Sequence, residues 1–151
     1  MKHSLEVKRQ IGTGRVVLAE MNERDQRFFG NYFDIHGCIH PAQRRDYRVP
    51  EVSLEKTNDM PRKIWDKYGS EFCQRKGTRS NIWEITRDAN KLVFLKRIEP
   101  YLHIRRPRAA IAIEMLNILL DRPSWRIDKD TRKELNDSAA QMRSLIHCQR
   151  Y

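Results

Sequence analysis

The stretch that leads into Cys38 restricts the fold of this chain more than any other part of the sequence. Aromatic side chains recur there at the spacing of one helical face: Phe28, Phe29, Tyr32 and Phe33. Asn22 is a suitable residue to cap the start of this helix, and Gly37 is suited to end it. The sequence therefore predicts a helix over residues 23–36 that opens directly into a strand.

Two β-hairpins with basic tips are expected after this helix. Their strands are predicted at residues 38–43 and 47–56, and then at residues 71–76 and 81–86. Residues 44–46 and Gly77 read as the turns. Because proline cannot donate to a strand ladder, Pro50 favours an edge position or a bulge for the second strand.

Further helices are indicated by apolar stripes that begin and end at capping or breaking residues. They are expected at residues 60–68, from Asn90 to the residue before Pro100, from Pro107 up to Pro123, and at 128–147. Asp59 and Asn90 are predicted as caps of the first two. The order is helix, hairpin, helix, hairpin and three helices, which indicates an α+β fold in one domain.

The composition favours a polyanionic partner. The chain of 151 residues carries 30 Lys+Arg against 20 Asp+Glu, a formal net charge of +10. Neutralising nucleic-acid phosphates with such residues releases condensed counterions. The longest apolar run, Ala109 to Leu120, is interrupted by Glu114 and Asn117 and is too short to span a membrane. Since the first residues also lack the apolar stretch of a secretory signal, an intracellular protein is expected.

The cysteines give no framework for a disulfide or a zinc site. Cys38, Cys73 and Cys148 are far apart in the sequence and form no C-x-x-C pair. We therefore expect reduced thiols, most simply small residues buried in the core.

Four segments follow one another along the chain in a distinctive order: Phe29–Gly37, Val52–Thr57, Gly69–Gly77 and Ile98–Arg106. Together they resemble the LAGLIDADG homing endonucleases. The resemblance extends from about Asn22 to Leu120 and implies an αββαββα core with a four-stranded antiparallel saddle sheet and extra C-terminal helices. It divides the chain into an N-terminal extension (1–21), a nucleic-acid-binding domain (22–121) and a C-terminal helical extension (122–151).

The resemblance also implies a catalytic site at the tip of the first helix. The family places a metal-binding carboxylate there and uses magnesium or manganese, but this chain has His36. An imidazole suits zinc, nickel, copper or iron better than magnesium, so His36 is a candidate metal ligand or proton carrier. Arg105 matches the family's basic active-site residue, and Lys56 is the candidate to order water. Glu55 replaces Lys56 if the strand register differs by one residue.

Alternation along the strands predicts which side chains face a DNA groove. If Cys73, Trp83 and Ile85 face the helices, the opposite set faces the groove, including Phe72, Tyr47, Val49 and Glu51. Candidates for contacts with base edges are His40, Arg44, Ser53, Gln74, Lys76 and Glu84. Candidates for phosphate contacts are Arg45, Arg48, Arg75 and Arg79.

A homodimer is expected, because the family needs two such half-domains for one DNA site. Phe29, Gly30 and Phe33 are the predicted interface residues. Asn31 and Ile35 occupy positions where the family has a glycine and a small residue, so a wider crossing is expected. Pairing with a different half-domain is the alternative.

The leading functional hypothesis is a homing endonuclease that binds a long double-stranded DNA site and cuts it with metal help, with cleavage weakened or lost. The alternative is a derivative that binds without cutting, either a DNA-binding regulator or an RNA-binding splicing or ribosome-associated protein. A third possibility is a basic structural protein, whose binding would disappear with salt and show no sequence preference.

Overall fold

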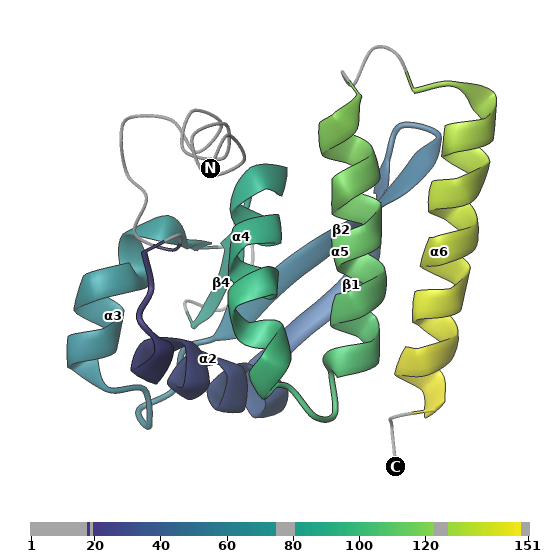
Figure 1. The fold of residues 1–151 in the computed structure, drawn as a ribbon. Helices are drawn as coiled ribbons and strands as arrows, with labels where there is room; N and C mark the ends of the chain where they lie inside the picture. The colour runs from purple at the N-terminus through teal and green to yellow at the C-terminus, as the bar shows by residue number, and fades with distance from the viewer. Residues whose placement is uncertain (1–17, 19, 75–80, 123–126, 149–151) are drawn as a thin grey trace.

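The computed structural model describes residues 18, 20–74, 81–122 and 127–148. Helices lie against a four-stranded antiparallel sheet whose strand order is β1-β2-β4-β3. The strands are β1 (Gly37–Arg44), β2 (Tyr47–Glu55), β3 (Cys73–Gln74) and β4 (Ile82–Ile85). The predicted α+β class and the helix-hairpin-helix-hairpin-helix order are confirmed, and Figure 1 shows α4 and α5 in front of the sheet, with α6 beside α5.

The first helix, α2 (Glu23–His36), has the bounds that the sequence predicts. Asn22 caps it, since the Asn22 side chain accepts a hydrogen bond of 2.8 Å from the Asp25 N–H. At the other end, Gly37 donates its N–H to the carbonyl of Phe33 and is also the first residue of β1. A Cβ on Gly37 would lie only 2.3 Å from the Phe33 ring, so the junction requires glycine.

The prediction that Pro50 places the second strand at an edge or in a bulge is wrong. β2 lies between β1 and β4, and its register with β1 is regular, with Pro50 opposite Pro41. However, β4 pairs only with the stretch of β2 from Val52 to Glu55. Pro50 lies before this stretch, so its missing N–H costs no bond to β4.

The remaining helices are close to their predicted positions. They are α3 (Arg62–Tyr68), the short η1 (Gly69–Glu71), α4 (Asp88–Ile98), the short η2 (Glu99–Tyr101), α5 (Arg106–Asp121) and α6 (Lys129–Cys148). α3 begins only after Pro61, so Asp59 does not cap it. α4 begins two residues earlier than expected, and Asn90 is buried inside its first turn instead of capping it.

The core lies between the sheet and the helices and is rich in aromatic rings. Phe29 contacts Tyr68, Phe72 and Phe94, with ring centroids 5.5 to 6.3 Å apart. The C-terminal helix contributes Leu135 and Met142, which are fully buried. Among the described helices, none is both long and apolar enough to cross a membrane.

Candidate nucleic-acid interface

The sheet has a core-facing side and an outer side that carries polar residues. Val52, Leu54 and Ile85 are buried in the core. The strand register places a second set in one row across all four strands: Cys38, Ser53, Glu84 and Cys73. His40 and Glu51 are paired in the next row. This outer side, which we call the polar sheet face, is the candidate surface for nucleic acid.

A shallow cleft of about 330 Å³ lies where the tip of α2 meets the polar sheet face. Its lining includes His36, Cys38, Ser53, Glu55 and Arg105. The structure thus brings together two of the predicted catalytic residues, His36 and Arg105. The ring of His36 packs on that of Tyr32, with centroids 4.6 Å apart.

The prediction of Lys56 as a catalytic residue is wrong in its placement. β2 ends at Glu55, and the Lys56 ammonium lies 4.5 Å from the ring centroid of Trp65, in a cation–π contact. Glu55, the alternative by one residue, lines the cleft instead. The Tyr32 hydroxyl holds this end of β2 by donating to the Glu55 carbonyl at 2.7 Å.

Asp34 connects the tip of α2 to the start of α5. Its carboxylate accepts hydrogen bonds from the backbone N–H groups of His103, Ile104 and Arg105, at 3.2, 3.1 and 2.9 Å. The Arg105 guanidinium in turn donates to the Asp34 carbonyl oxygen. These contacts place Arg105 beside the cleft, and burial lowers the pKa of its guanidinium.

Arg108 is a second basic residue near the cleft that the sequence did not single out. It is 7% exposed, and its Nη1 lies 3.5 Å from the carbonyl oxygen of Ile39 in β1. Burial and the nearby charge of Arg105 lower its pKa. Arg108 follows Arg105 by three residues, a spacing that places two side chains on the same face of a helix. The apolar residues around Arg108 favoured a core role for this face, so the sequence pattern did not indicate Arg108.

The residues around His36 do not fit a magnesium site within one chain. Magnesium is held by oxygen ligands in octahedral geometry. The cleft offers one imidazole, one thiol and the single carboxylate of Glu55. In the described residues no three His, Cys, Asp or Glu side chains converge as metal ligands would. We therefore do not assign His36 as a metal ligand.

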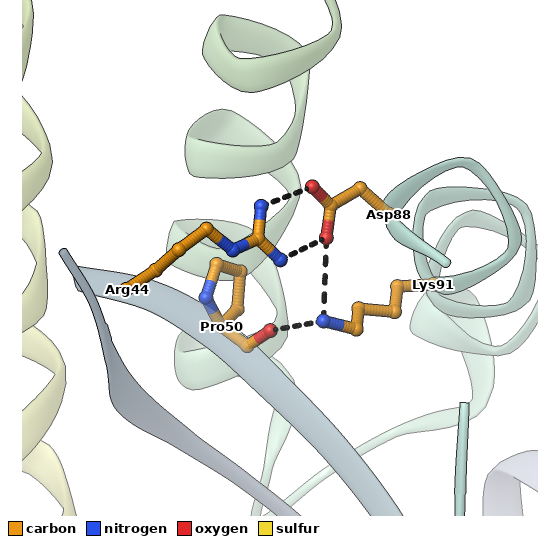
Figure 2. A network of polar contacts seen from close by, with 4 residues as sticks. All are labelled: Arg44, Pro50, Asp88 and Lys91. Atoms are coloured by element: carbon orange, nitrogen blue, oxygen red, sulfur yellow. Dashed lines mark hydrogen bonds and ion pairs between the residues drawn. The ribbon is translucent and has the colours of Figure 1, made fainter. Parts of the chain in front are cut away.

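Arg44, a candidate for base contacts, is held by an ion pair within the chain. Its guanidinium donates two hydrogen bonds to Asp88, at 2.7 and 3.0 Å, across 44 residues of sequence (Figure 2). Lys91, only 5% exposed, binds Asp88 at 3.3 Å and the Pro50 carbonyl at 3.0 Å. We call these residues the Asp88 network; it fastens the first hairpin to α4.

Other residues predicted to contact DNA lie elsewhere in the structure than expected. Phe72, Tyr47 and Val49, expected in the groove, are buried in the core with exposures of 3 to 4%. Ser53 lies on the polar sheet face but is 4% exposed. Cys73, expected to face the helices, is exposed on the polar sheet face.

The remaining candidates keep accessible positions where the structure describes them. Arg45 and Gln74 are exposed, and His40, Arg48 and Glu84 are partly exposed. Arg45 forms the turn of the first hairpin in the left-handed region, with a φ of 56°. The backbone N–H of Arg48 donates to Asn136 of α6. Arg75, Lys76 and Arg79 lie outside the described residues.

The predicted dimer-interface residues make contacts within the chain itself. Phe29 and Phe33 are fully buried in the core, so they cannot contact a partner in this conformation. Gly30 faces inward, where an added Cβ would lie 2.5 Å from the Tyr101 Cβ. The exposed face of α2 carries Asn31 and Ile35 instead, and the Ile35 side chain is 69% exposed.

Comparison with solved structures identifies the fold. A crystal structure of the homing endonuclease I-CvuI in complex with its target, in the presence of calcium, matches with a TM-score of 0.61 and 17% identity, covering 82% of this chain and 85% of the other. A second I-CvuI structure, with the I-CreI target in magnesium and the DNA not cleaved, has a TM-score of 0.53 and 13% identity, covering 86% and 99%. No protein-family model and no curated protein matches the chain. The chain therefore has the LAGLIDADG homing-endonuclease fold.

Proposed function

We propose that this protein binds a long double-stranded DNA site through the polar sheet face, as a homing-endonuclease-type DNA-binding protein whose metal-dependent cleavage is weak or lost. The observation that carries this proposal is the polar row across all four strands beside the tip of α2. The net charge of +10 and the likeness to I-CvuI structures determined with DNA targets support it. A twisted β-ribbon of this kind can enter the major groove.

The proposal of weak cleavage rests on the composition of the cleft. His36 replaces the carboxylate that the family resemblance implies, and Lys56 lies over the Trp65 ring and does not line the cleft. Arg105 remains beside His36, where a guanidinium can hold a phosphate with charge-assisted hydrogen bonds. The cleft is thus suited to hold a DNA backbone without an oxygen-rich site for magnesium.

A homodimer is part of this proposal. The exposed face of α2, with Asn31 and Ile35, is the surface on which a second copy would pack. Ile104, 55% exposed, adds a second exposed apolar side chain to the protein surface. Two larger residues at the crossing would hold the helices farther apart than glycine does.

The decisive experiment uses a supercoiled plasmid that contains the protein's own locus. Binding is measured by gel shift with locus fragments and unrelated duplexes, and nicking is measured with magnesium or manganese. We expect a locus-specific complex whose affinity falls by about 10³ between 50 and 200 mM salt, with little or no nicking. Equal affinity for unrelated duplexes would contradict site-specific DNA binding, and efficient nicking would contradict the loss of cleavage.

The same binding assay distinguishes the DNA-binding proposal from the RNA-binding alternative. Structured RNA transcribed from the locus is used as a competitor against the locus duplex. Preferred binding to RNA would replace the DNA proposal, because the A-form helix presents a different groove to a β-ribbon. Preferred binding to the duplex supports the proposal as stated.

A further inference from the structure

Cys38, His40 and Glu51 form a line on the polar sheet face. The Cys38 Sγ lies 3.5 Å from the His40 Nδ1, and the His40 Nε2 lies 3.6 Å from a Glu51 carboxylate oxygen. Cys38 and His40 are two residues apart on β1, and Glu51 is directly opposite His40 on β2. A thiol, an imidazole that can take its proton and a carboxylate that orients the imidazole form the arrangement of an activated nucleophile.

Two guanidinium groups next to β1 add positive charge close to this thiol. The Nε atoms of Arg105 and Arg108 are buried and have no hydrogen-bond partner among the described residues. Arg108 is 7% exposed and reaches the carbonyl of Ile39, the neighbour of Cys38. The Asp34 carboxylate accepts from backbone N–H groups instead of these side chains. The Nη1 atoms of both residues have carbonyl partners, so it is the two Nε atoms that are left without one, and an anionic ligand would supply an acceptor for them.

These neighbours lower the pKa of the Cys38 thiol. The hydrogen bond between Cys38 and His40 lowers the pKa of Cys38, burial opposes this, and the charges of His40, Arg108 and Arg105 lower it further. Such an electropositive and accessible environment is typical of reactive cysteines. Cys38 is exposed and lines the cleft of about 330 Å³, so a small reagent can reach it. The expectation of a buried cysteine is therefore wrong for Cys38.

We propose that Cys38 is a site of reversible thiolation by anionic low-molecular-weight disulfides, and that this modification closes the polar sheet face to nucleic acid. The second half rests on the proposed function. A mixed disulfide at Cys38 would fill the cleft beside His36 and place carboxylates where the DNA backbone is expected. Like charges at this site repel phosphates.

The chemical step is a thiol–disulfide exchange. His40 accepts the proton of Cys38, and the thiolate attacks one sulfur of the disulfide R–S–S–R. A new bond forms between Cys38 and that sulfur while the original S–S bond breaks. The electron pair of the broken bond leaves on RS⁻, which takes the proton from His40. The disulfide is the oxidant, and an added dithiol reverses the reaction.

The first test compares two cysteines on the same face of one protein. A Cys73→Ser, Cys148→Ser variant retains Cys38, and a Cys38→Ser, Cys148→Ser variant retains the exposed Cys73 as the matched control. Glutathione disulfide is the anionic probe, cystamine is the cationic probe, and mass spectrometry follows the mixed disulfide. We expect Cys38 to react with glutathione disulfide about tenfold faster than Cys73, with a smaller advantage for cystamine. Equal rates at both cysteines would overturn the proposal.

The second test separates the role of the cluster from mere accessibility. His40→Gln and Glu51→Gln are introduced into the protein that retains Cys38, and circular dichroism confirms folding. We expect each change to slow the reaction, and His40→Gln to bring it close to the rate of Cys73. If His40→Gln does not fold, Glu51→Gln provides the same test. Unchanged rates in a folded variant would show that the line of three side chains does not activate the thiol.

The third test measures locus DNA binding before and after complete thiolation of each variant. We expect thiolation at Cys38 to weaken binding at least about tenfold, with recovery after dithiothreitol, and thiolation at Cys73 to have a smaller effect. Unchanged binding after thiolation of Cys38 would overturn the regulatory half. If the reduced protein binds no duplex at all, the proposed function fails, while the reaction rates still decide whether Cys38 is the reactive site.

Discussion

Asp34 and Arg105 hold each other through both backbone and side chain. The Arg105 N–H donates to the Asp34 carboxylate at 2.9 Å, and the Arg105 guanidinium donates to the Asp34 carbonyl. Asp34 is in the last turn of α2, and Arg105 immediately precedes α5. The pair therefore joins the two helix ends that border the cleft.

Replacing Asp34 tests how much this junction stabilises the fold. Asp34→Ala removes a buried acceptor of three backbone N–H groups, so we expect unfolding to become easier by about 3 kcal/mol. Urea denaturation measures the change. Asp66→Ala, at an exposed position of α3, is the matched control and should change stability by less than about 1 kcal/mol. Equal effects of the two changes would contradict a structural role for Asp34.

The Asp88 network predicts a specific loss of stability in acid. Burial alone would raise the pKa of Asp88, but hydrogen bonds from Arg44 and the charges of Lys91 and Arg44 lower it below its ordinary value. The stabilisation is therefore complete above the unfolded-state pKa of about 3.9 and is lost as the pH falls through the lower folded-state pKa.

The measurement for this network is urea unfolding between neutral pH and pH 3. At neutral pH, Asp88→Asn should lower the free energy of unfolding by about 3 kcal/mol, because Lys91 stays buried with the Pro50 carbonyl but loses its carboxylate partner. The difference from the native protein should shrink below about pH 4. Asp137→Asn, at an exposed site on α6, is the control. A difference that stays constant with pH would show that the charge of Asp88 is not the cause.

Restoring a carboxylate at the tip of α2 tests the account of weak cleavage. We expect His36→Asp to increase magnesium-dependent nicking of the locus plasmid by at least about tenfold, since it adds a hard oxygen ligand on the face of the cleft. His36→Asn, which adds no charge, is the matched control. Efficient nicking by the native protein, or none by His36→Asp in spite of tight binding, would contradict this account.

A substitution on the exposed face of α2 tests the proposed dimer. Ile35→Asp should shift the protein from dimer to monomer in sedimentation experiments, because it places a charge in an apolar contact at a cost of about 2 kcal/mol or more. Ala140→Asp adds the same charge at an exposed position of α6 and should leave the dimer intact. A native protein that is monomeric at micromolar concentrations, with and without DNA, would contradict the proposed interface.

Local patterns were sufficient to predict the element order and the first helix. Asn22, the aromatic stripe and Gly37 all act within a few residues, and their bounds for α2 are confirmed. Phe72 was misplaced because η1 precedes β3 and changes the phase of the alternation. Lys56 was misplaced because β2 ends one residue earlier, where the Lys56 N–H donates to the carbonyl of Asn81.

The functional residues depended on contacts that are remote in the sequence. Asp88 neutralises Arg44 across 44 residues, and no local pattern indicates this pairing. Arg108 and Cys38 are brought together only when α5 packs against β1. The burial of Phe29 and Phe33 could have been inferred from the same aromatic stripe that predicted α2, but the family resemblance favoured an interface instead.

The shared residue Gly37 has a mechanical consequence. Because α2 ends at His36 and β1 begins at Gly37, no linker residue separates the helix from the strand. If α2 tilted against a second copy in the proposed dimer, β1 would tilt with it. The sheets of the two copies would then move apart or closer together. In the proposed dimer, the bulk of Ile35 would then set the distance between the two sheets and therefore the spacing of the half-sites that they would contact.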